Sequence, residues 1–310
     1  MATQTAVVKP SGEQFEIALE GQHAVVVAVG GGLRTYAVDG RDVIDGYGVH
    51  EMASAGRGQV LIPWPNRLQD GSYEFDGQRH QLPLTEPPHS NAIHGLVRWG
   101  EWHERAREPH RVVVGHVVHP QPGYPFSLDL TIEYDLSAGG LTVRTTATNV
   151  GETTCPYGAG AHPYLTVGTE TVDDVLLRVP ARTVLRADDR GIPVGGVQIG
   201  ETDLDFRVAR RIGDTKLDHG FTDLERDDAG VARVELSAGE GGVTLWLDDG
   251  FRYLMVFTGD LPGVDRGGLA VEPMTCAPNA FRSGEGLVAL VPGESHTATW
   301  GLSPTVEVGE

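Results

Sequence analysis

The stretch FSLDLTIEYDLSAGGLTVRTTATNV, residues 126–150, decides the fold class. Apolar and polar residues alternate through most of Phe126 to Leu136 and Leu141 to Val150, and β-branched residues recur in both runs. Such alternation is typical of strands that bury one face. The link Ser137-Ala138-Gly139-Gly140 is short and rich in glycine, which favours a turn. This stretch therefore predicts two long antiparallel strands joined by a turn.

The same pattern recurs along the chain. We expect further strands at residues 15–19, 23–29, 33–38, 73–75, 79–82, 111–118, 175–179, 231–236, 243–247, 253–257 and 296–302. No window of a dozen residues has the 3.6-residue apolar period of a helix. The 42 glycines and 19 prolines are dispersed, so they indicate turns rather than a linker. We predict an all-β fold, a large antiparallel β-sandwich, in which residues 1–310 form a single domain.

The charge balance limits the possible partners. The chain has 43 acidic and 24 basic residues, a formal net charge of -19. A phosphate backbone would be repelled by this field, so nucleic acid is not an expected partner. Met1 to Gly12 lacks a signal-peptide pattern, and no segment has the ~18 consecutive apolar residues of a membrane span. We expect a cytoplasmic protein with no membrane partner.

The two cysteines, Cys155 and Cys276, argue against a disulfide framework and fit a reducing compartment. Their sequence neighbours would not lower a thiol pKa, so we interpret both as small buried residues. The 12 histidines form no zinc-binding pattern, and no phosphate-binding glycine loop is present. We therefore expect neither a metal nor another cofactor.

Glu272 ends an apolar run that begins at Gly268, and Pro273 follows it. Because proline cannot donate to a strand ladder, we expect this carboxylate at a strand end. Partial desolvation would raise its pKa and make it a better base near neutral pH. The alternative is an ordinary edge glutamate paired with an arginine.

His162 follows a run of small residues, Tyr157 to Ala161, that leaves room for a close approach. Tyr164 lies two residues on and shares its face if the segment is extended. A histidine can donate a proton near pH 7, so His162 is a candidate general acid. The alternative is a histidine bonded to backbone in a tight turn.

Two further polar clusters are candidates for substrate binding. Asn66 and Arg67 follow Pro65, and His94 and Arg98 share a second short stretch. The arginine fork suits sugar hydroxyls or an anion. Three tryptophans lie near these groups in the sequence: Trp64, Trp99 and Trp102. Aromatic rings beside polar groups suit the C–H face of a sugar, but core packing explains these tryptophans equally well. Asp218 either accepts sugar hydroxyls or begins a turn.

Six motifs in chain order resemble those of the aldose 1-epimerase (galactose mutarotase) family: PWPNR (63–67), an Asp-Gly pair before a strand, NAIHG (91–95), HPY (162–164), DHGF (218–221) and VEPM (271–274). The resemblance runs from about residue 61 to 280. It implies a galactose mutarotase-like supersandwich, no cofactor, and an isomerase that interconverts the α and β anomers of a free aldohexose such as glucose or galactose.

Carried over motif by motif, the resemblance makes Glu272 the base that takes the proton of the anomeric hydroxyl. His162 becomes the acid that protonates the ring oxygen. The other family positions hold or orient the sugar, and here they are occupied by Arg67, His94, Tyr164 and Asp218.

Arg98 departs from this pattern, since a second arginine after the histidine looks more like relatives that act on hexose 6-phosphates or sulfonated sugars. Arg67 and Arg98 together could hold such an anion. Alternatively, Arg98 is a surface residue paired with Glu101 or Glu104. A non-catalytic carbohydrate-binding protein on the same fold also stays open, and we expect a monomer or homodimer.

Overall fold

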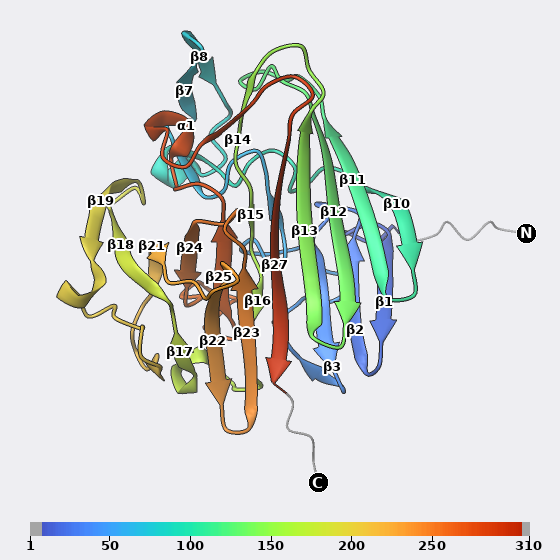
Figure 1. Cartoon of the computed structure of the whole chain (residues 1–310), viewed down its shortest axis with the longest axis vertical. Coiled ribbons are helices and arrows are strands. Elements are labelled where there is room, and N and C mark those ends of the chain that lie inside the picture. The colour runs from blue at the N-terminus through green and yellow to red at the C-terminus, as the bar shows by residue number, and fades with distance from the viewer. Residues whose placement is uncertain (1–7, 306–310) are drawn as a thin grey trace, which may run out of the picture.

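The computed structural model describes residues 8–305, and strands dominate it. A nine-stranded antiparallel sheet forms one side of the molecule (Figure 1). Its strands, in spatial order, are β10 (His103–Glu108), β11 (Arg111–Val118), β12 (Leu128–Ser137), β13 (Gly140–Asn149), β27 (Ser295–Thr305), β23 (Gly241–Leu247), β22 (Ala232–Ala238), β17 (Leu176–Arg178) and β20 (Arg210–Arg211).

A second large sheet has eight strands and carries the polar motifs. Its path is β19 (Pro193–Gln198), β18 (Ala181–Ala187), β21 (Asp218–Leu224), β24 (Tyr253–Phe257), β25 (Leu269–Met274), β15 (Gly160–Ala161) and β5 (Val60–Leu61), with β16 (Tyr164–Leu165) also paired to β25. A four-stranded sheet lies beside it: β1 (Gln14–Leu19), β2 (Gln22–Val27), β3 (Leu33–Val38) and β4 (Arg41–Asp42).

Short elements complete the fold. Three two-stranded sheets pair β6 (Arg67–Gln69) with β9 (Asn91–Ile93), β7 (Ser72–Phe75) with β8 (Gln78–Gln81), and β14 (Cys155–Tyr157) with β26 (Val288–Leu290). The helical pieces are α1 (Ala280–Ser283) and three 3₁₀ turns, Pro87–His89, Val172–Asp174 and Ile199–Glu201. The scarcity of helix agrees with the missing 3.6-residue period.

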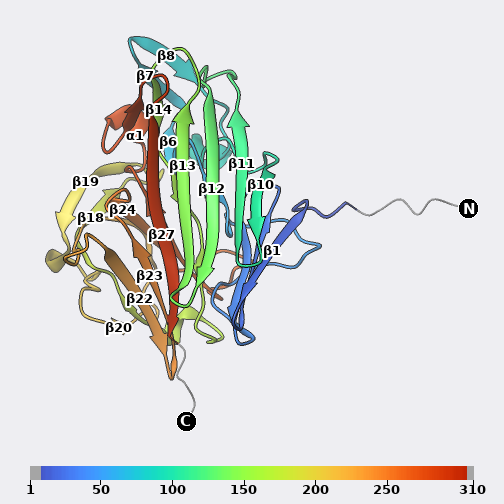
Figure 2. The same ribbon diagram turned by 45° about the vertical axis from the view of Figure 1, so that its right-hand side comes forward.

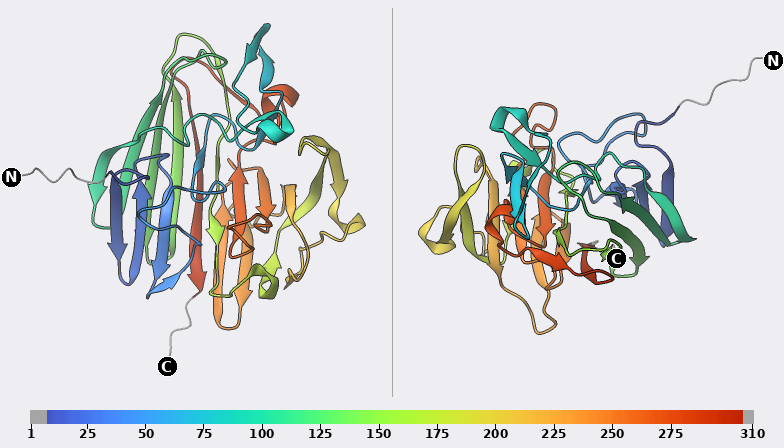
Figure 3. Two further views of the ribbon diagram at one scale, coloured as in Figure 1. Left: turned by 180° about the vertical axis from the view of Figure 1, so that it is seen from behind. Right: turned by 90° about the horizontal axis from the view of Figure 1, so that it is seen from above.

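The hairpin β12–β13 confirms the expectation from residues 126–150. Successive residues of β12 alternate between buried and partly exposed, and the strand pairs with β13 from Leu128↔Asn149 to Ser137↔Gly140. Its inward side chains join residues of the other two large sheets in one hydrophobic core that includes Ile17, Ile132 and Leu254. Figure 3 shows from behind how the blue four-stranded sheet covers the long green strands. The fold is therefore the expected all-β sandwich.

Several strands lie where the sequence pattern gave no expectation, and β10 and β21 show why. All six residues of β10 are exposed, so no buried apolar residue marks this edge strand (Figure 2). The DHGF motif, one reading of which was the start of a turn, belongs to β21, which pairs with β18 and β24. In both cases pairing with a neighbour stabilises a strand that its own side chains do not specify.

Candidate active site

Glu272 lies inside a central strand, which corrects the expectation of a strand end. It pairs in register with Met255, and the next residue, Pro273, still pairs with Leu254. On its other side, β25 meets only the short strands β15 and β16, which are separated at His162 and Pro163. Proline is tolerated in β25 because the neighbouring ladder is interrupted there.

A cavity of about 560 Å³ opens over this face of the eight-stranded sheet. The cross-strand pairs Leu185↔Gly220, Gly220↔Met255 and Met255↔Glu272 form one row across the sheet. Residues directly opposite each other on neighbouring strands share a face. Leu185, Gly220 and Met255 line the cavity, and Glu272 continues their row beside it, although neither Glu272 nor His162 is among the lining residues.

His162 faces Glu272 across the interruption between β15 and β16. Its Nε2 lies 3.3 Å from Oε1 of Glu272, and both side chains are at most 5% exposed. Its backbone is held on both sides, because His162 N–H donates to the Gln59 carbonyl and its own carbonyl accepts from Gly58 N–H. The ring therefore meets a carboxylate rather than turn backbone.

Burial shifts the two groups of this pair in opposite directions. Desolvation raises the pKa of Glu272 well above its usual value, and the negative charge of Asp218 adds to this, while Arg67 acts against it. Desolvation lowers the pKa of His162 far below its usual value, and the charges of Arg98 and Arg57 contribute to the decrease. Both shifts favour a pair without net charge, in which one proton is shared.

His94 completes a buried trio with this pair. Its ring meets that of His162 edge-on at 5.4 Å between centroids. The backbone N–H of Asn66 donates to Nδ1 of His94 at 3.2 Å, so Nδ1 must present its lone pair. A neutral His94 ring then carries its proton on Nε2 and acts there as a hydrogen-bond donor.

The trio has the ligand types and spacing of a metal site, because one ligand atom each of His94, His162 and Glu272 lies within 4.8 Å of the others. However, a metal at His94 would need the lone pair of Nε2 while Asn66 already occupies that of Nδ1. The arginine charges also disfavour a cation. The donor set therefore suits a hydroxylated ligand better than a metal ion.

Arg67 reaches the same cavity but is already paired. Its Nε and Nη2 donate to the carboxylate of Glu86 at 3.0 to 3.1 Å. Glu86 also accepts from Asn91 Nδ2 at 3.0 Å. Sequence reasoning missed Glu86, although a partly buried arginine fork needs a counter-charge. Asn66 and Asp218 line the cavity as well, and Asp218 is exposed.

Arg98 is half-buried and has no acidic partner within residues 8–305. Its guanidinium makes only long contacts, 3.4 Å to Oε1 of Gln59 and 3.5 Å to the carbonyl of Ile93, and burial lowers its pKa. Glu104, one of the two suggested surface partners, pairs with Arg107 instead. Arg98 is therefore a partly desolvated cation whose charge reaches His94 and His162.

Tyr164 and the tryptophans lie behind the site rather than in the cavity. The Tyr164 ring stacks on that of His162 at 5.2 Å, and its hydroxyl donates to the Ala55 carbonyl. Trp64 and Trp102 are buried in the core, while Trp99 is 55% exposed. None of these rings is among the residues that line the cavity. The interpretation of the tryptophans as a sugar platform was wrong for Trp64 and Trp102, which pack in the core.

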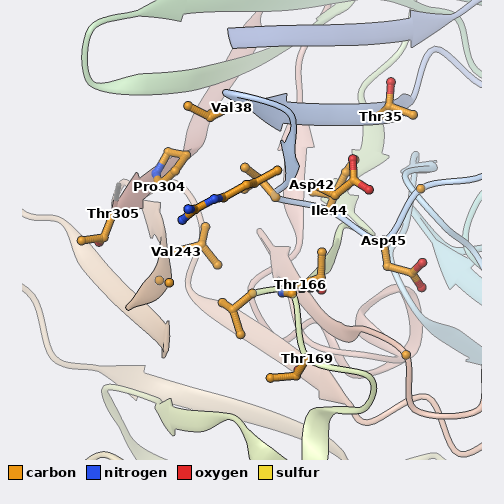
Figure 4. A pocket seen from close by; sticks show the side chains of 18 of the residues that line it. Thr35, Val38, Asp42, Ile44, Asp45, Thr166, Thr169, Val243, Pro304 and Thr305 are labelled. Atoms are coloured by element: carbon orange, nitrogen blue, oxygen red, sulfur yellow. Dashed lines mark hydrogen bonds between the residues drawn. The ribbon is translucent and has the colours of Figure 1, made fainter. Parts of the chain in front are cut away.

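A larger cavity of about 880 Å³ lies between β3, β4 and the ends of β23 and β27. Figure 4 shows side chains from β3, β23, β27 and the loop after β16 around it. Of its acidic groups, Asp42, Glu51 and Glu240 are exposed, and Asp45 is partly exposed and pairs with Arg57. Cys155 and Cys276 are free and buried, with thiol pKa values raised by burial to about 11 and about 12. Among residues 8–305 no helix has the length and hydropathy to cross a membrane.

Comparisons with known proteins agree with this architecture. Residues 13–303 match the model of the family described as aldose 1-epimerase. The chain is 37% identical over 290 residues to the uncharacterized protein YihR of Escherichia coli (strain K12), covering 92% of this chain and 91% of that one.

Solved structures show the same fold at lower identity. The GalM/aldose epimerase homologue from C. elegans superposes with a TM-score of 0.83 at 17% identity, covering 95% of this chain and 99% of that one. Galactose 1-epimerase from Lactobacillus acidophilus NCFM has a TM-score of 0.78 at 20% identity, covering 97% and 98%. With the family model matching nearly its whole length, the chain belongs to the aldose 1-epimerase family.

Proposed function

We propose that the protein is an aldose 1-epimerase that interconverts the α and β anomers of a free aldohexose such as glucose or galactose. The observation that carries this proposal is the buried pair of His162 and Glu272, 3.3 Å apart, next to a cavity of about 560 Å³ that is lined by Met255, the cross-strand neighbour of Glu272. That volume lies in the usual range for small-molecule sites. A binding protein would need no such pair.

The reaction follows from moving one proton through the pair. Once the shared proton has moved from Glu272 to His162, the Glu272 carboxylate takes the proton of the anomeric hydroxyl while His162 gives its proton to the ring oxygen O5. The C1–O5 bond breaks, C1 becomes an aldehyde carbon, and rotation about C1–C2 exposes its other face. On closure, His162 takes the proton of the O5 hydroxyl and Glu272 returns one to O1. The pair holds one proton before and after each half-reaction.

The surrounding groups would orient the sugar. His94 presents an N–H to the site, and Asp218 can accept from sugar hydroxyls at the cavity wall. Two of the nitrogens of Arg67 are engaged by Glu86, which fixes the direction of the remaining Nη1 donors. Such preorganised donors limit the entropy lost when a hydroxylated ligand binds.

Anomer exchange measured by NMR with α-glucose and α-galactose tests the proposal. The wild type should accelerate equilibration, and Glu272→Gln, which cannot accept the proton, should lose roughly 10²- to 10⁴-fold in turnover. Glu240→Gln in the larger cavity is the matched control and should keep full activity. Near-normal turnover by Glu272→Gln would remove Glu272 from the base role. Sugar binding without any acceleration would favour a non-catalytic binding protein.

A second candidate, an epimerase of an anionic hexose, is favoured by Arg98. A half-buried guanidinium without a carboxylate partner is a costly arrangement that an anion would relieve. A phosphate or sulfonate on the sugar could supply this charge. The net charge of -19 would slow the approach of such a substrate without excluding a local basic site.

Comparing glucose 6-phosphate with glucose in the same exchange assay separates the two candidates. If the anion matters, kcat/KM for the phosphate should exceed that for glucose, and Arg98→Met should lower it tenfold or more while affecting glucose little. Equal effects of Arg98→Met on both sugars would reject the anionic substrate. A sulfonated hexose is the next substrate to compare.

A further inference from the structure

The side of His162 that faces away from the cavity is packed against a small cluster of groups outside the proposed chemistry. The Tyr164 ring lies nearly parallel to the imidazole, at 16° and 5.2 Å between centroids. The guanidinium of Arg57 lies over the same tyrosine ring at 5.1 Å. A cation over an aromatic face is attracted by the ring quadrupole, so this stack holds together.

Arg57 is itself held firmly. Its Nε and Nη2 donate to Oδ2 of Asp45 at 3.1 and 2.7 Å, and its Nη1 donates to Oγ of Ser54 at 3.0 Å. The side chain is only 9% exposed. The backbone N–H of Asp45 donates to the Tyr164 carbonyl, so the same residue anchors both layers of the stack. A guanidinium held by three hydrogen bonds, two of them to one carboxylate oxygen, has little freedom to move.

The loop that carries Arg57 also contacts the histidine directly. Gly56 has a φ of +80°, and a Cβ there would lie 2.6 Å from Cδ2 of His162. Only glycine allows the backbone to approach the imidazole so closely. The ring of His162 is therefore enclosed by this loop and by Tyr164.

We propose that Arg57 is a positioning residue for His162, which acts through Tyr164 and the loop around Gly56 to fix the imidazole against Glu272. The inference rests on the proposed acid role of His162. Arg57 touches neither the cavity nor the pair, since it does not line the cavity and bonds to Asp45 and Ser54. Its second effect is electrostatic, because its charge disfavours an additional proton on His162.

The charge environment of His162 comes from several elements. The titratable and charged groups that face it are Arg57, His94, Arg98, Tyr164 and Glu272. Of the two arginines, Arg98 contacts Gln59 and the Ile93 carbonyl, whereas Arg57 lies over the Tyr164 ring. Substitution of Arg57 thus removes one positive charge from behind the histidine and leaves the proposed substrate contacts intact.

Arg57→Met tests the proposal, with Arg57→Lys as the conservative variant. We expect Arg57→Met to lower kcat roughly tenfold with KM within twofold, because a misplaced acid slows the chemical step and not the binding. Both limbs of the pH profile should move to higher pH, since loss of a nearby positive charge favours protonation of the pair. Arg57→Lys should restore both limbs of the pH profile because it keeps the positive charge. It should restore only part of kcat, because an ammonium group cannot reproduce the two guanidinium hydrogen bonds to Asp45.

Arg266→Met is the matched control. Arg266 is also mostly buried and pairs with Asp173 and Asp260, but it does not contact the His162 stack. The Arg266→Met variant should have a lower melting temperature than the wild type but an unchanged pH profile of activity. If Arg57→Met behaves like Arg266→Met, Arg57 is merely structural and the proposal is overturned.

The His162 imidazole can also be titrated directly by NMR, without any turnover. An upward shift of its pKa in Arg57→Met, together with altered ring shifts, supports the positioning role even if no tested sugar is epimerised. An unchanged titration overturns the role whatever the activity. This titration therefore tests the positioning role of Arg57 independently of the proposed epimerase activity.

Discussion

The cavity beside the row of residues that ends at Glu272 encloses about 560 Å³, whereas the cavity beside β3, β23 and β27 encloses about 880 Å³. Both are lined by a mixture of apolar and polar residues. The carboxylates of the larger cavity, such as Asp42 and Glu240, are exposed to water. At the smaller one, Glu272 and His162 are almost completely buried and face each other.

The difference teaches that desolvation, more than volume, marks a place for chemistry. Exposed carboxylates keep their hydration and hold their protons only in acid. Burial moves the pKa of Glu272 up and that of His162 down, so a single proton can pass between them near neutral pH. Within residues 8–305, the larger cavity is lined by no buried pair of a histidine and a carboxylate.

Removing the proton-transferring groups should give the largest difference in kcat between variants of the two cavities. We expect His162→Gln and Glu272→Gln each to lower kcat by roughly 10²- to 10⁴-fold, and the double variant to be little worse than either. The two residues share one proton, so losing either stops the transfer. Asp42→Asn and Glu240→Gln in the larger cavity should change kcat less than twofold. Fully additive losses in the double variant would mean that the residues act independently.

Filling the cavities provides a smaller but equally direct comparison. Ala187 lines the site cavity and Thr169 lines the larger one. Ala187→Trp should raise KM for the sugar about tenfold by occupying the space of the substrate, while kcat changes less. Thr169→Trp should leave both constants within twofold. Sensitivity of KM to Thr169→Trp would show that the larger cavity takes part in substrate binding.

The regular part of the fold was predictable because its side chains specify it. In β12 and β13 buried residues recur at every second position, and β11 is a run rich in valine, so these strands can be located within about two residues. The edge strand β10 has no buried residue, and only its neighbour's hydrogen bonds define it. A single sequence contains no trace of such a strand.

The site was predictable in its residue types but not in its partnerships. The motifs indicated His162 and Glu272, and the structure places them 3.3 Å apart. That Glu86 occupies the fork of Arg67 depends on a contact between residues 19 positions apart. The same holds for Asp45 and Arg57, which form a buried pair that no local pattern marks. Long-range pairing of charges follows from the tertiary fold, which local periodicity does not encode.

The pH dependence of activity tests whether the pair shares one proton. Ordinary His and Glu side chains would give limbs near 6.5 and 4.5, their unshifted values. Because burial lowers the pKa of His162, a second proton should be added only at a pH well below 6.5. Because burial raises the pKa of Glu272, the last proton should be lost only well above 4.5. We expect a broad plateau of kcat/KM through neutral pH; an acid limb centred at 6.5 would contradict the shared proton.

Stability should show the smallest effect, with a sign opposite to that on activity. The pKa of Glu272 is raised in the folded protein, so its stability contribution is fully present below pH 4.5 and is lost as pH rises through the raised pKa. Each unit of upward shift costs about 1.4 kcal/mol once the group is charged. Glu272→Gln removes this loss. Its melting temperature should therefore match the wild type near pH 4 and exceed it by a few degrees at pH 8, as thermal unfolding at the two pH values would reveal. The lowered pKa of His162 acts in both proteins and largely cancels from the difference. A melting temperature below that of the wild type at pH 8 would mean that the Glu272 carboxylate stabilises the fold, and the contrast between a strained buried pair and the relaxed, hydrated carboxylates of the larger cavity would fail.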